Sequence, residues 1–476
     1  MTPVDARTLD RAGTKLSSDR VEQLSRRLRG PLLTEGDDGY DDSRRIWNAM
    51  IEKRPALIAR CTGAADVRAA VAFAREHELL LSVHGGGHNV AGNAVCEGGL
   101  MLDLSPMNQV RVDPGTRTAR VGGGAVMADL DHESQAFGLA TTGGIVSTTG
   151  VAGITLGGGL GYLSRKHGLV HDNLRSVNVV TADGEVVRAS EDENSDLFWG
   201  MRGGGGNFGV ATSFEFDLHE LGPEILSVQL VYPFEAAPGV LRFYREFMTD
   251  APEEVQVYAA VLMGSPELSV PEPLHGETLL ALGGMYAGDV EDGRRAFRPL
   301  REFGEPIADL TEPLPYTARQ QQLDGLYREG HRNYWKSDFY DALSDGFIEV
   351  LMEHADPLPS AHSTVFWEWM GGAVEEVAPD ATAFAHRDAA FTFTVAPKWE
   401  DPGRDEEMVA WARSFHDAVQ PYASDGVYVN YLGQDEGEER VEEAYGDRYQ
   451  RLVELKNEWD PYNLFRMNQN IEPAGP

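Results

Sequence analysis

The sequence is poor in cysteine, in lysine and in long apolar runs. Two cysteines among 476 residues, Cys61 and Cys96, cannot make a disulfide framework and are typical of a reducing compartment. No run of about 18 apolar residues occurs, so no membrane-spanning helix is predicted. The first residues lack the charged and then apolar layout of a secretory signal. These absences predict a cytoplasmic protein without a membrane partner.

Positive charge is scarce as well. Lysine and arginine total 41 against 76 acidic residues, which gives a net charge of −35, and only six of the 41 are lysines. Such a negative field repels nucleic-acid phosphates, so nucleic-acid binding is excluded. The composition predicts a halophilic protein, because dense carboxylates keep a surface hydrated while concentrated salt screens their repulsion. A merely acidic protein of an ordinary cytoplasm is the alternative.

The length and the distribution of glycine indicate several domains. At roughly 100–200 residues per domain, 476 residues predict two or three. Most glycine clusters lie in residues 56–215, whereas strand-like and helical runs alternate from there to residue 425. We therefore predict a cofactor domain over residues 1–217, a substrate domain over 218–425, and a C-terminal return to the first domain over 426–476.

Apolar periodicity predicts an α+β fold. In the first region, residues 66–76 have helical spacing and residues 176–188 are typical of a hairpin. In the second region, strands mixed with amphipathic helices favour an antiparallel sheet with helices on one face. The predicted strands there are 225–232, 255–263, 278–286, 363–370 and 391–395, and the predicted helices are 233–250, 291–303 and 405–420.

Four glycine clusters lie at residues 85–87, 122–124, 150–161 and 203–209. Glycine allows close backbone approach, so consecutive N–H groups can point at an anion. The clusters therefore predict a phosphate-bearing cofactor, with structural turns as the alternative. No Gly-Lys pair exists, which excludes a P-loop. Gly204, Gly206 and Gly209 match the dinucleotide pattern GxGxxG, but a predicted strand follows where that fold needs a helix.

Metal binding is not predicted. His84 and His88 are four residues apart, as metal ligands on a helix would be. The three glycines between them disfavour a helix, and no cysteine or carboxylate cluster lies nearby. We therefore expect no metal site.

A strand runs into a glycine loop that ends in His88 and Asn89, over residues 80–92. This stretch resembles the pyrophosphate loop of berberine-bridge-enzyme-like flavoproteins, which belong to the vanillyl-alcohol oxidase/PCMH superfamily. Segments at 143–161, 203–216, 427–431 and 459–473 match that family in the same order. The resemblance implies a PCMH-type FAD-binding domain of two α/β subdomains, followed by a substrate domain with an antiparallel sheet covered by helices.

The resemblance also implies which residues hold FAD. His88 corresponds to the histidine that bonds the 8α-methyl group of the flavin, and an unlinked loop histidine is the alternative. Relatives with a second link carry a cysteine where this chain has Val146, so a single link through His88 is expected. The other implied FAD contacts are Gly85, Gly86, Gly87, Asn89, Gly92, Gly144, Gly150, Gly153, Thr155, Gly157, Gly161, Gly209, Val210, Asn463 and Asn468.

The implied activity is oxidation of an alcohol, sugar or amine by hydride transfer to flavin N5 while a base removes a proton. Tyr431 is the first candidate base, with a purely packing role as the alternative. Glu368 is the second, because it shares a strand face with Phe366 and Met370, and a solvent-facing charge is its alternative. Oxygen or another acceptor would reoxidise the flavin. A noncovalent FAD-binding protein and an NAD(P)-dependent Rossmann dehydrogenase are the competing functions, and the oligomeric state is open.

Aromatic residues of the second region are candidates for a substrate pocket. Large aromatic side chains more often belong to a core, so both locations stay open at this point. The residues concerned are Trp335, Trp367, Trp369, Phe391 and Phe393.

Overall fold

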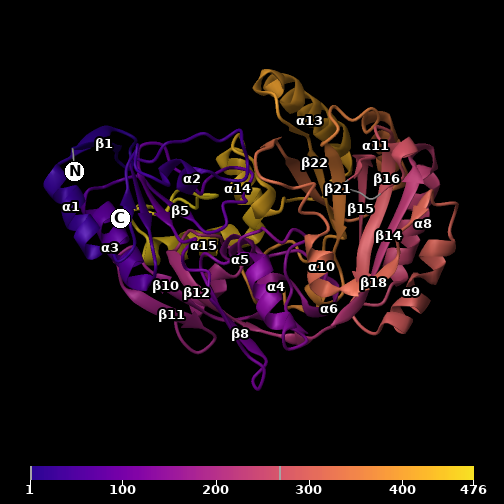
Figure 1. Ribbon diagram of the computed structural model, residues 1–476, viewed down its shortest axis with the longest axis horizontal. Helices are drawn as coiled ribbons and strands as arrows, with labels where there is room; N and C mark the ends of the chain where they lie inside the picture. The colour runs from indigo at the N-terminus through magenta and orange to yellow at the C-terminus, as the bar shows by residue number, and fades with distance from the viewer. Residues whose placement is uncertain (1–2, 267–269, 476) are drawn as a thin grey trace.

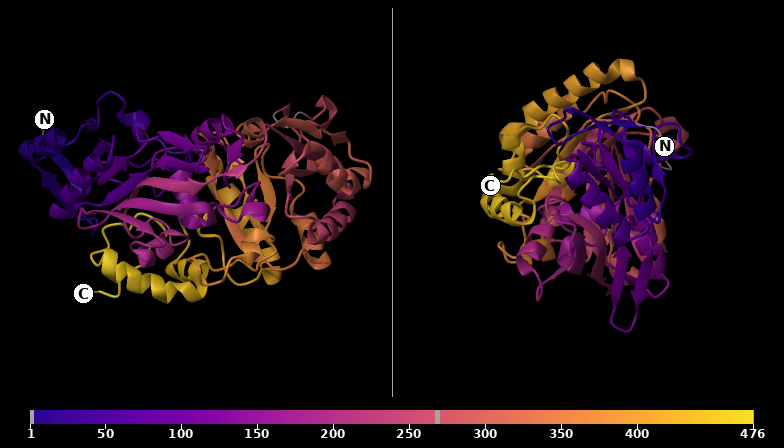
Figure 2. Two further views of the ribbon diagram at one scale, coloured as in Figure 1. Left: turned by 90° about the horizontal axis from the view of Figure 1, so that it is seen from below. Right: turned by 90° about the vertical axis from the view of Figure 1, so that its left-hand side faces the viewer.

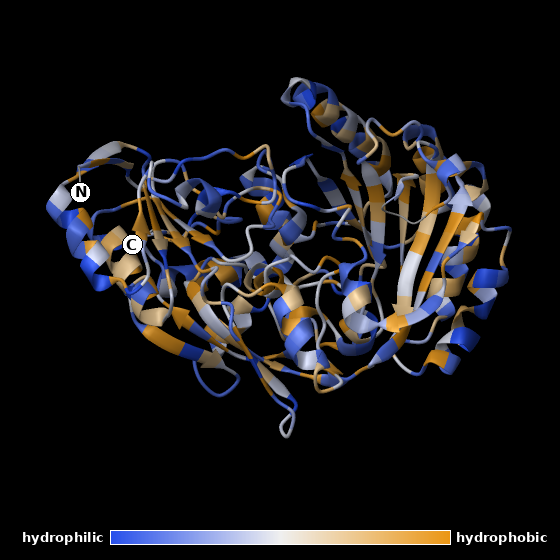
Figure 3. Cartoon of the chain, in the orientation of Figure 1, coloured by the Kyte–Doolittle hydropathy of each residue, from blue (hydrophilic) through white to orange (hydrophobic). Residues whose placement is uncertain are grey.

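The computed structural model describes residues 3–266 and 270–475. Of the three larger β-sheets, the two smaller ones lie in the half of the molecule that holds the N-terminus and the largest lies in the other half, with helices around them (Figure 1). Apolar residues concentrate on the strands and on the helix faces that pack against them (Figure 3). Within the described residues, no helix combines the length and the apolar character needed to cross a membrane.

The first sheet belongs to the N-terminal part. Strands β4 and β5 run parallel to β6, whereas β3 is antiparallel to β4. Helix α3 (Ala64–Glu76) packs its apolar side against this sheet, which confirms the helix predicted at residues 66–76. The Asp66 carboxylate accepts backbone N–H groups of Arg29, Gly30 and Thr62 and so ties down the start of α3. In spatial order the strands are β3 (Leu32–Leu33), β4 (Leu57–Arg60), β6 (Leu100–Asp103) and β5 (Leu81–His84).

The second sheet is antiparallel throughout. Its first two strands form the hairpin predicted at residues 176–188. Helix α7 (Ser195–Met201) precedes the GxGxxG match and β12 follows it, which is the reverse of the strand-then-helix order that dinucleotide binding requires. In spatial order the strands are β11 (Val186–Ser190), β10 (Leu174–Val180), β12 (Val210–Asp217), β8 (Thr118–Gly122) and β7 (Val110–Asp113).

The third sheet is the largest and is antiparallel, as predicted. Helices α8 (Ala237–Asp250), α9 (Val290–Glu302), α11 (Asp345–His354) and α13 (Asp405–Val419) cover one face of it (Figure 1). The sequence prediction missed α11 and the edge strand β20. In spatial order the strands are β17 (Ala308–Asp309), β14 (Glu224–Pro233), β16 (Thr278–Tyr286), β15 (Val255–Met263), β21 (Thr364–Trp369), β22 (Phe391–Ala396) and β20 (Lys336–Tyr340), with β18 (Glu312–Pro315) also paired to β14.

Strand β21 shows how the two faces of the third sheet differ. Side chains alternate along a strand, so Val365, Trp367 and Trp369 join the core beneath the helices. Phe366 and Glu368 point to the opposite face and line a cavity. The candidate aromatics Trp367, Trp369, Phe391 and Phe393 are therefore core residues, whereas Trp335 lines the cavity.

The C-terminal segment returns to the end of the molecule that holds the N-terminus (Figures 1 and 2). A buried ion pair anchors it, because Lys456 Nζ lies 2.8 Å from Asp460 Oδ2 and also donates to the carbonyls of Asn207 and Phe465. The domain boundaries at residues 217 and 425 stay predictions. The segment contains η7 (Val429–Tyr431), α14 (Glu438–Tyr445) and α15 (Tyr449–Trp459).

Shorter elements connect these layers. The helices among them are α1 (Ser18–Arg27), α2 (Tyr40–Arg44), α4 (Met127–Gln135), α5 (Val151–Gly157), α6 (Ser164–His167), α10 (Tyr316–Gln321) and α12 (Ala373–Glu376). The paired short strands are β1 (Val4–Arg7) with β2 (Gly13–Leu16), β9 (Leu139–Ala140) with β13 (His219–Glu220), and β19 (Arg332–Asn333) with β23 (Lys398–Trp399).

Candidate active site

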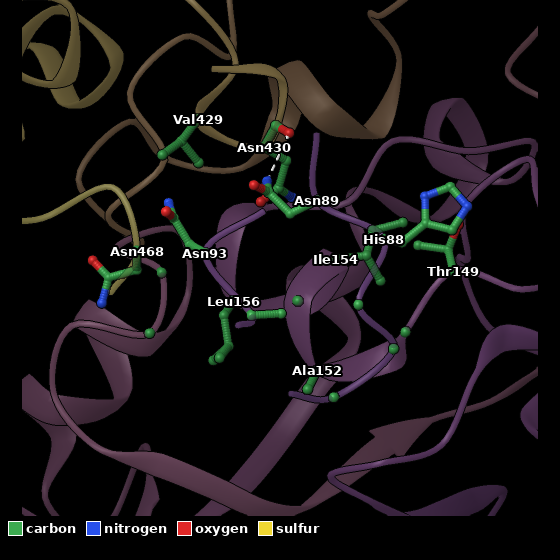
Figure 4. Close-up of a pocket in the computed structure, with 18 of the residues that line it drawn as sticks. His88, Asn89, Asn93, Thr149, Ala152, Ile154, Leu156, Val429, Asn430 and Asn468 are labelled. Carbon is green, nitrogen blue, oxygen red and sulfur yellow. Dashed lines mark hydrogen bonds between the residues drawn. The ribbon is translucent and has the colours of Figure 1, made fainter. Parts of the chain in front are cut away.

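A cavity of about 290 Å³ lies where the N-terminal part, the third sheet and the C-terminal return meet. Figure 4 shows the loop after β5, helix α5 and the C-terminal segment around one open space. The loop and the return are joined directly, since Asn89 Nδ2 donates to the carbonyl of Asn430 at 3.2 Å. Segments more than 300 residues apart in the chain thus share one wall.

Glycine allows the cavity wall to be built from backbone. A Cβ atom on Gly86 would lie 2.4 Å from Gly150 Cα, so the first and third glycine clusters touch through main chain alone. A Cβ atom on Gly157 would lie 2.2 Å from Asn430 Oδ1, which shows how closely the return approaches α5. The overlap with backbone excludes a side chain at Gly86, whereas a side chain at Gly157 would force the Asn430 amide to move.

His88 lies on this wall. Its imidazole stacks on Trp47, with ring centroids 4.6 Å apart, and Trp47 is held by its Nε1–H bond to the carbonyl of Tyr327. Burial lowers the pKa of His88 to about 4, so the ring is neutral near pH 7. Its Nε2 is buried without a hydrogen-bond partner. A neutral imidazole keeps a lone pair on one of its ring nitrogens, which a bond to a carbon electrophile requires.

Most of the implied FAD contacts lie on the cavity wall. Those on the wall are Gly85, Gly86, Gly87, His88, Asn89, Gly144, Gly150, Gly153, Gly209, Val210 and Asn468. Asn93, Leu156, Met467 and Gln469 also line the cavity, although no motif marked them. These placements describe the cavity, and the binding roles themselves stay predictions.

Five implied contacts lie off the wall: Gly92, Thr155, Gly157, Gly161 and Asn463. Thr155 bonds within α5, because its hydroxyl donates to the carbonyl of Val151 at 2.6 Å. Gly92, with φ +65°, packs on Ile51 in a turn. Added Cβ atoms at residues 122–124 would meet the carbonyls of Met107, Ala211 and Leu104, so that whole cluster serves backbone packing.

The two candidate bases form one pair. The Tyr431 hydroxyl donates to Glu368 Oε2 at 2.5 Å, and the Thr392 hydroxyl donates to the same oxygen at 3.3 Å. Glu368 is only 1% exposed, so the alternative of a solvent-facing carboxylate is wrong. Burial raises the pKa of Glu368 to about 7, and burial together with the nearby carboxylate raises the pKa of Tyr431 well above 10. Near neutral pH the tyrosine therefore holds its proton and the glutamate titrates.

A second chamber of about 230 Å³ adjoins the first. Ile145, Tyr327, Phe366 and Glu368 line both chambers, so the Tyr431–Glu368 pair lies at their junction. Sequence reasoning missed this chamber because its polar residues come from separate strands, from α10 and the residue after it, and from the segment between α5 and α6. Its polar lining residues are Tyr162, Gln229, Tyr258, Arg319, Gln322 and Thr364.

One group of potential metal ligands lies outside both chambers. His331, His362 and Glu400 place ligand atoms within 4.8 Å of one another. Arg328 Nε donates to His331 Nε2 at 3.2 Å, and burial, with the added charges of His362, Arg328 and Lys398, lowers the pKa of His331 to about 4. Nearby positive charge opposes the binding of a cation at this cluster.

Comparison with known proteins agrees with this architecture. Residues 55–190 match the FAD binding domain family, and residues 427–472 match the family described as berberine and berberine like. The (R)-6-hydroxynicotine oxidase of Paenarthrobacter nicotinovorans is 32% identical over 475 residues, covering 97% of this chain and 100% of that protein.

Solved structures extend the likeness. The 6-hydroxy-D-nicotine oxidase of Arthrobacter nicotinovorans superposes with a TM-score of 0.85 at 29% identity, covering 94% of this chain and 98% of the other. Chitooligosaccharide oxidase superposes with a TM-score of 0.83 at 25% identity, covering 96% and 100%. The chain belongs to the berberine-bridge-enzyme-like FAD-linked oxidoreductases. Its PCMH-type fold, its cofactor FAD and its class as an FAD-dependent oxidase or dehydrogenase are confirmed, and the Rossmann dehydrogenase alternative is wrong.

Proposed function

We propose that this oxidoreductase oxidises a carbon that carries an alcohol or amine group, using FAD attached through His88 alone. The observation that carries this proposal is the Tyr431–Glu368 hydrogen bond at the junction of the two chambers. The carboxylate of this pair, Glu368, titrates near neutral pH and lies between the cavity with the glycine wall and the chamber proposed for the substrate. The small-molecule substrate is an alcohol, sugar or amine. From the second chamber it reaches both the Glu368 carboxylate and the cavity with the glycine wall.

The residues of the first cavity fit FAD. Among the described residues that line it there is no lysine or arginine, so the backbone N–H groups of the glycine loops would hold the pyrophosphate. His88 Nε2, buried, neutral and without a partner, supports attachment through that atom. Bound FAD supplies the hydride acceptor for the substrate carbon.

The protein's own residues handle the proton. As hydride leaves the substrate carbon, the attached O–H or N–H loses its proton to the Tyr431 hydroxyl, whose own proton passes to Glu368 along the 2.5 Å hydrogen bond. The products are a carbonyl or imine, a protonated Glu368 and a reduced cofactor. Oxygen or another electron acceptor then takes the two electrons, and the proton leaves Glu368.

The positions of the two cysteines support a single covalent link to the flavin. Val146 lines the cavity at the place where a second link would need cysteine. Cys61 and Cys96 are buried elsewhere, packed near Ala59 and Leu80. Cytoplasmic location and salt adaptation stay predictions from composition, so assays belong in molar as well as dilute salt.

The test joins a chemical and a kinetic measurement. Protein precipitated with acid is expected to stay yellow, because a covalent bond survives unfolding. Anaerobic mixing with a panel of alcohols, sugars and amines is expected to bleach the flavin for at least one class. Flavin that is released on precipitation would overturn the covalent link, and flavin that no compound reduces at either salt concentration would overturn the oxidase function.

A further inference from the structure

The second chamber contains a buried positive charge without a negative partner. Arg319, on α10, is 3% exposed and lines the chamber. Its Nη1 contacts two neutral groups, Gln322 Oε1 and, at 3.5 Å, the Ser227 hydroxyl. Its Nε is buried and has no hydrogen-bond partner. Across the described residues, no carboxylate lies within ion-pair distance of this guanidinium, although the chain has 76 acidic residues.

Two tyrosines add unused hydrogen-bond donors around Arg319. The guanidinium lies over the Tyr162 ring, 4.3 Å from its centroid. The rings of Tyr162 and Tyr258 are 5.5 Å apart, and both hydroxyls are buried without hydrogen-bond partners. Burial raises the pKa of both tyrosines, so both hydroxyls keep the protons that they can donate.

Glu368, the carboxylate at the chamber's edge, does not pair with Arg319 or with the two tyrosine hydroxyls. Glu368, the only acid among the described residues that line either chamber, is bonded to Tyr431 and Thr392 instead. A buried cation and buried donors without acceptors lower stability unless a ligand supplies the missing charge and acceptors. A carboxylate matches them, because the guanidinium fork binds its two oxygens in parallel.

We propose that Arg319, with the hydroxyls of Tyr162 and Tyr258, binds the carboxylate of the substrate and thereby selects organic acids. Ala259, Leu262, Leu323 and Phe366 form an apolar part of the chamber wall, beside the polar side chains already listed, so the acid carries an alkyl or aryl body. This inference rests on the proposed function, because the carbon to be oxidised must reach the Tyr431–Glu368 pair. The substrate class is then a small carboxylic acid with an alcohol or amine group.

Calorimetric titration of the flavin-loaded protein with benzoate and benzamide at constant ionic strength tests the proposal. The two probes have nearly the same shape and differ in charge. Benzoate is expected to bind at least about tenfold more tightly, since hydrogen bonds to charged groups exceed neutral ones by that margin. Equal binding of both probes by the unaltered protein would overturn the carboxylate subsite without any need for a variant.

Matched variants locate the effect. Arg319→Gln is expected to lose the preference for benzoate, and Arg319→Lys to keep part of it, because charge remains while the fork is lost. Arg328→Gln removes the same charge from an exposed side chain outside the chamber and is expected to leave the preference unchanged. Equal benzoate affinities of Arg319→Gln and Arg328→Gln would overturn the role of Arg319. If Arg319→Gln does not fold, Tyr258→Phe is the second variant, and an unchanged preference there would overturn the role of its hydroxyl.

Failure of this inference differs from failure of the proposed function. If neutral alcohols or amines bleach the flavin while benzoate binds no better than benzamide, the subsite is wrong and the oxidase function stands. If no compound reduces the flavin, the oxidase function is wrong, and the benzoate titration still decides the subsite. For an acid that is oxidised, Arg319→Gln is expected to raise KM much more than it lowers kcat, because Arg319 contacts a group that does not react.

Discussion

The two chambers meet at Glu368 but are built from different material. In the first, glycine loops contact one another through backbone on one part of the wall, beside apolar side chains, α5, the C-terminal return and His88. The second has walls of side chains from one face of the third sheet and from α10. Backbone contacts tolerate few substitutions, whereas side chains on a strand face can be exchanged without changing the sheet. One scaffold can therefore keep its cofactor and vary its substrate.

The largest expected effect follows from changing His88, which lines the first chamber. His88→Ala should abolish covalent flavin, because the buried Nε2 is removed and no other residue on the wall replaces it. Absorbance of the acid-precipitated pellet measures this. His84→Ala is the control, since His84 ends β5 just before the loop and faces Asp103, with Nδ1 3.5 Å from Oδ1. Covalent flavin that persists in His88→Ala would mean that another residue makes the link.

The next effect concerns Glu368, which lines both chambers. Glu368→Gln keeps the shape of the side chain but cannot take a proton, so the rate of flavin reduction should fall by roughly 10²–10⁴-fold. Stopped-flow absorbance measures the rate, and flavin content should not change. Glu349→Gln, on the exposed side of α11, removes the same charge and should react normally. Equal rates in the two variants would leave Glu368 without a role in proton transfer.

The pH dependence should report the same group. Burial raises the pKa of Glu368 to about 7, and only the carboxylate form accepts a proton. The rate of flavin reduction should therefore rise about tenfold per pH unit below pH 7 and level off above it. Glu368→Gln should lose this rise. A profile that is flat between pH 5 and 8, from about two units below that pKa to about one unit above it, would show that another group controls the step.

The smallest expected effect separates two glycines of the first chamber by whether other protein atoms crowd their Cβ positions. Gly86→Ala should lower the free energy of unfolding by about 1–3 kcal/mol, because its Cβ would overlap Gly150. Gly153→Ala has open space around its Cβ and lies in α5, where alanine favours the helix by up to ~1 kcal/mol. Thermal unfolding followed by flavin fluorescence compares the two. Equal loss of stability would show that the loops do not depend on backbone contact.

Local sequence patterns predicted many of the strands and helices, and they predicted which side of its strand Glu368 occupies. The strands at residues 255–263 and 278–286 agree with β15 and β16, because alternating or continuous apolar runs depend only on neighbouring residues. The same alternation placed Glu368 on the face of Phe366, which the structure confirms. The solvent-facing alternative was wrong because a strand pattern does not show what covers each face.

The sequence by itself determined the glycine loop before His88, the alternation on β21 and the scarcity of positive charge, since each is a property of neighbouring residues or of composition. Only the tertiary structure decided that Trp47 stacks on His88, that Tyr431 bonds Glu368, and that Arg319 is buried without an acid. These pairs join positions far apart in the chain. Their geometry comes from the packing of sheets and helices, which no local pattern contains.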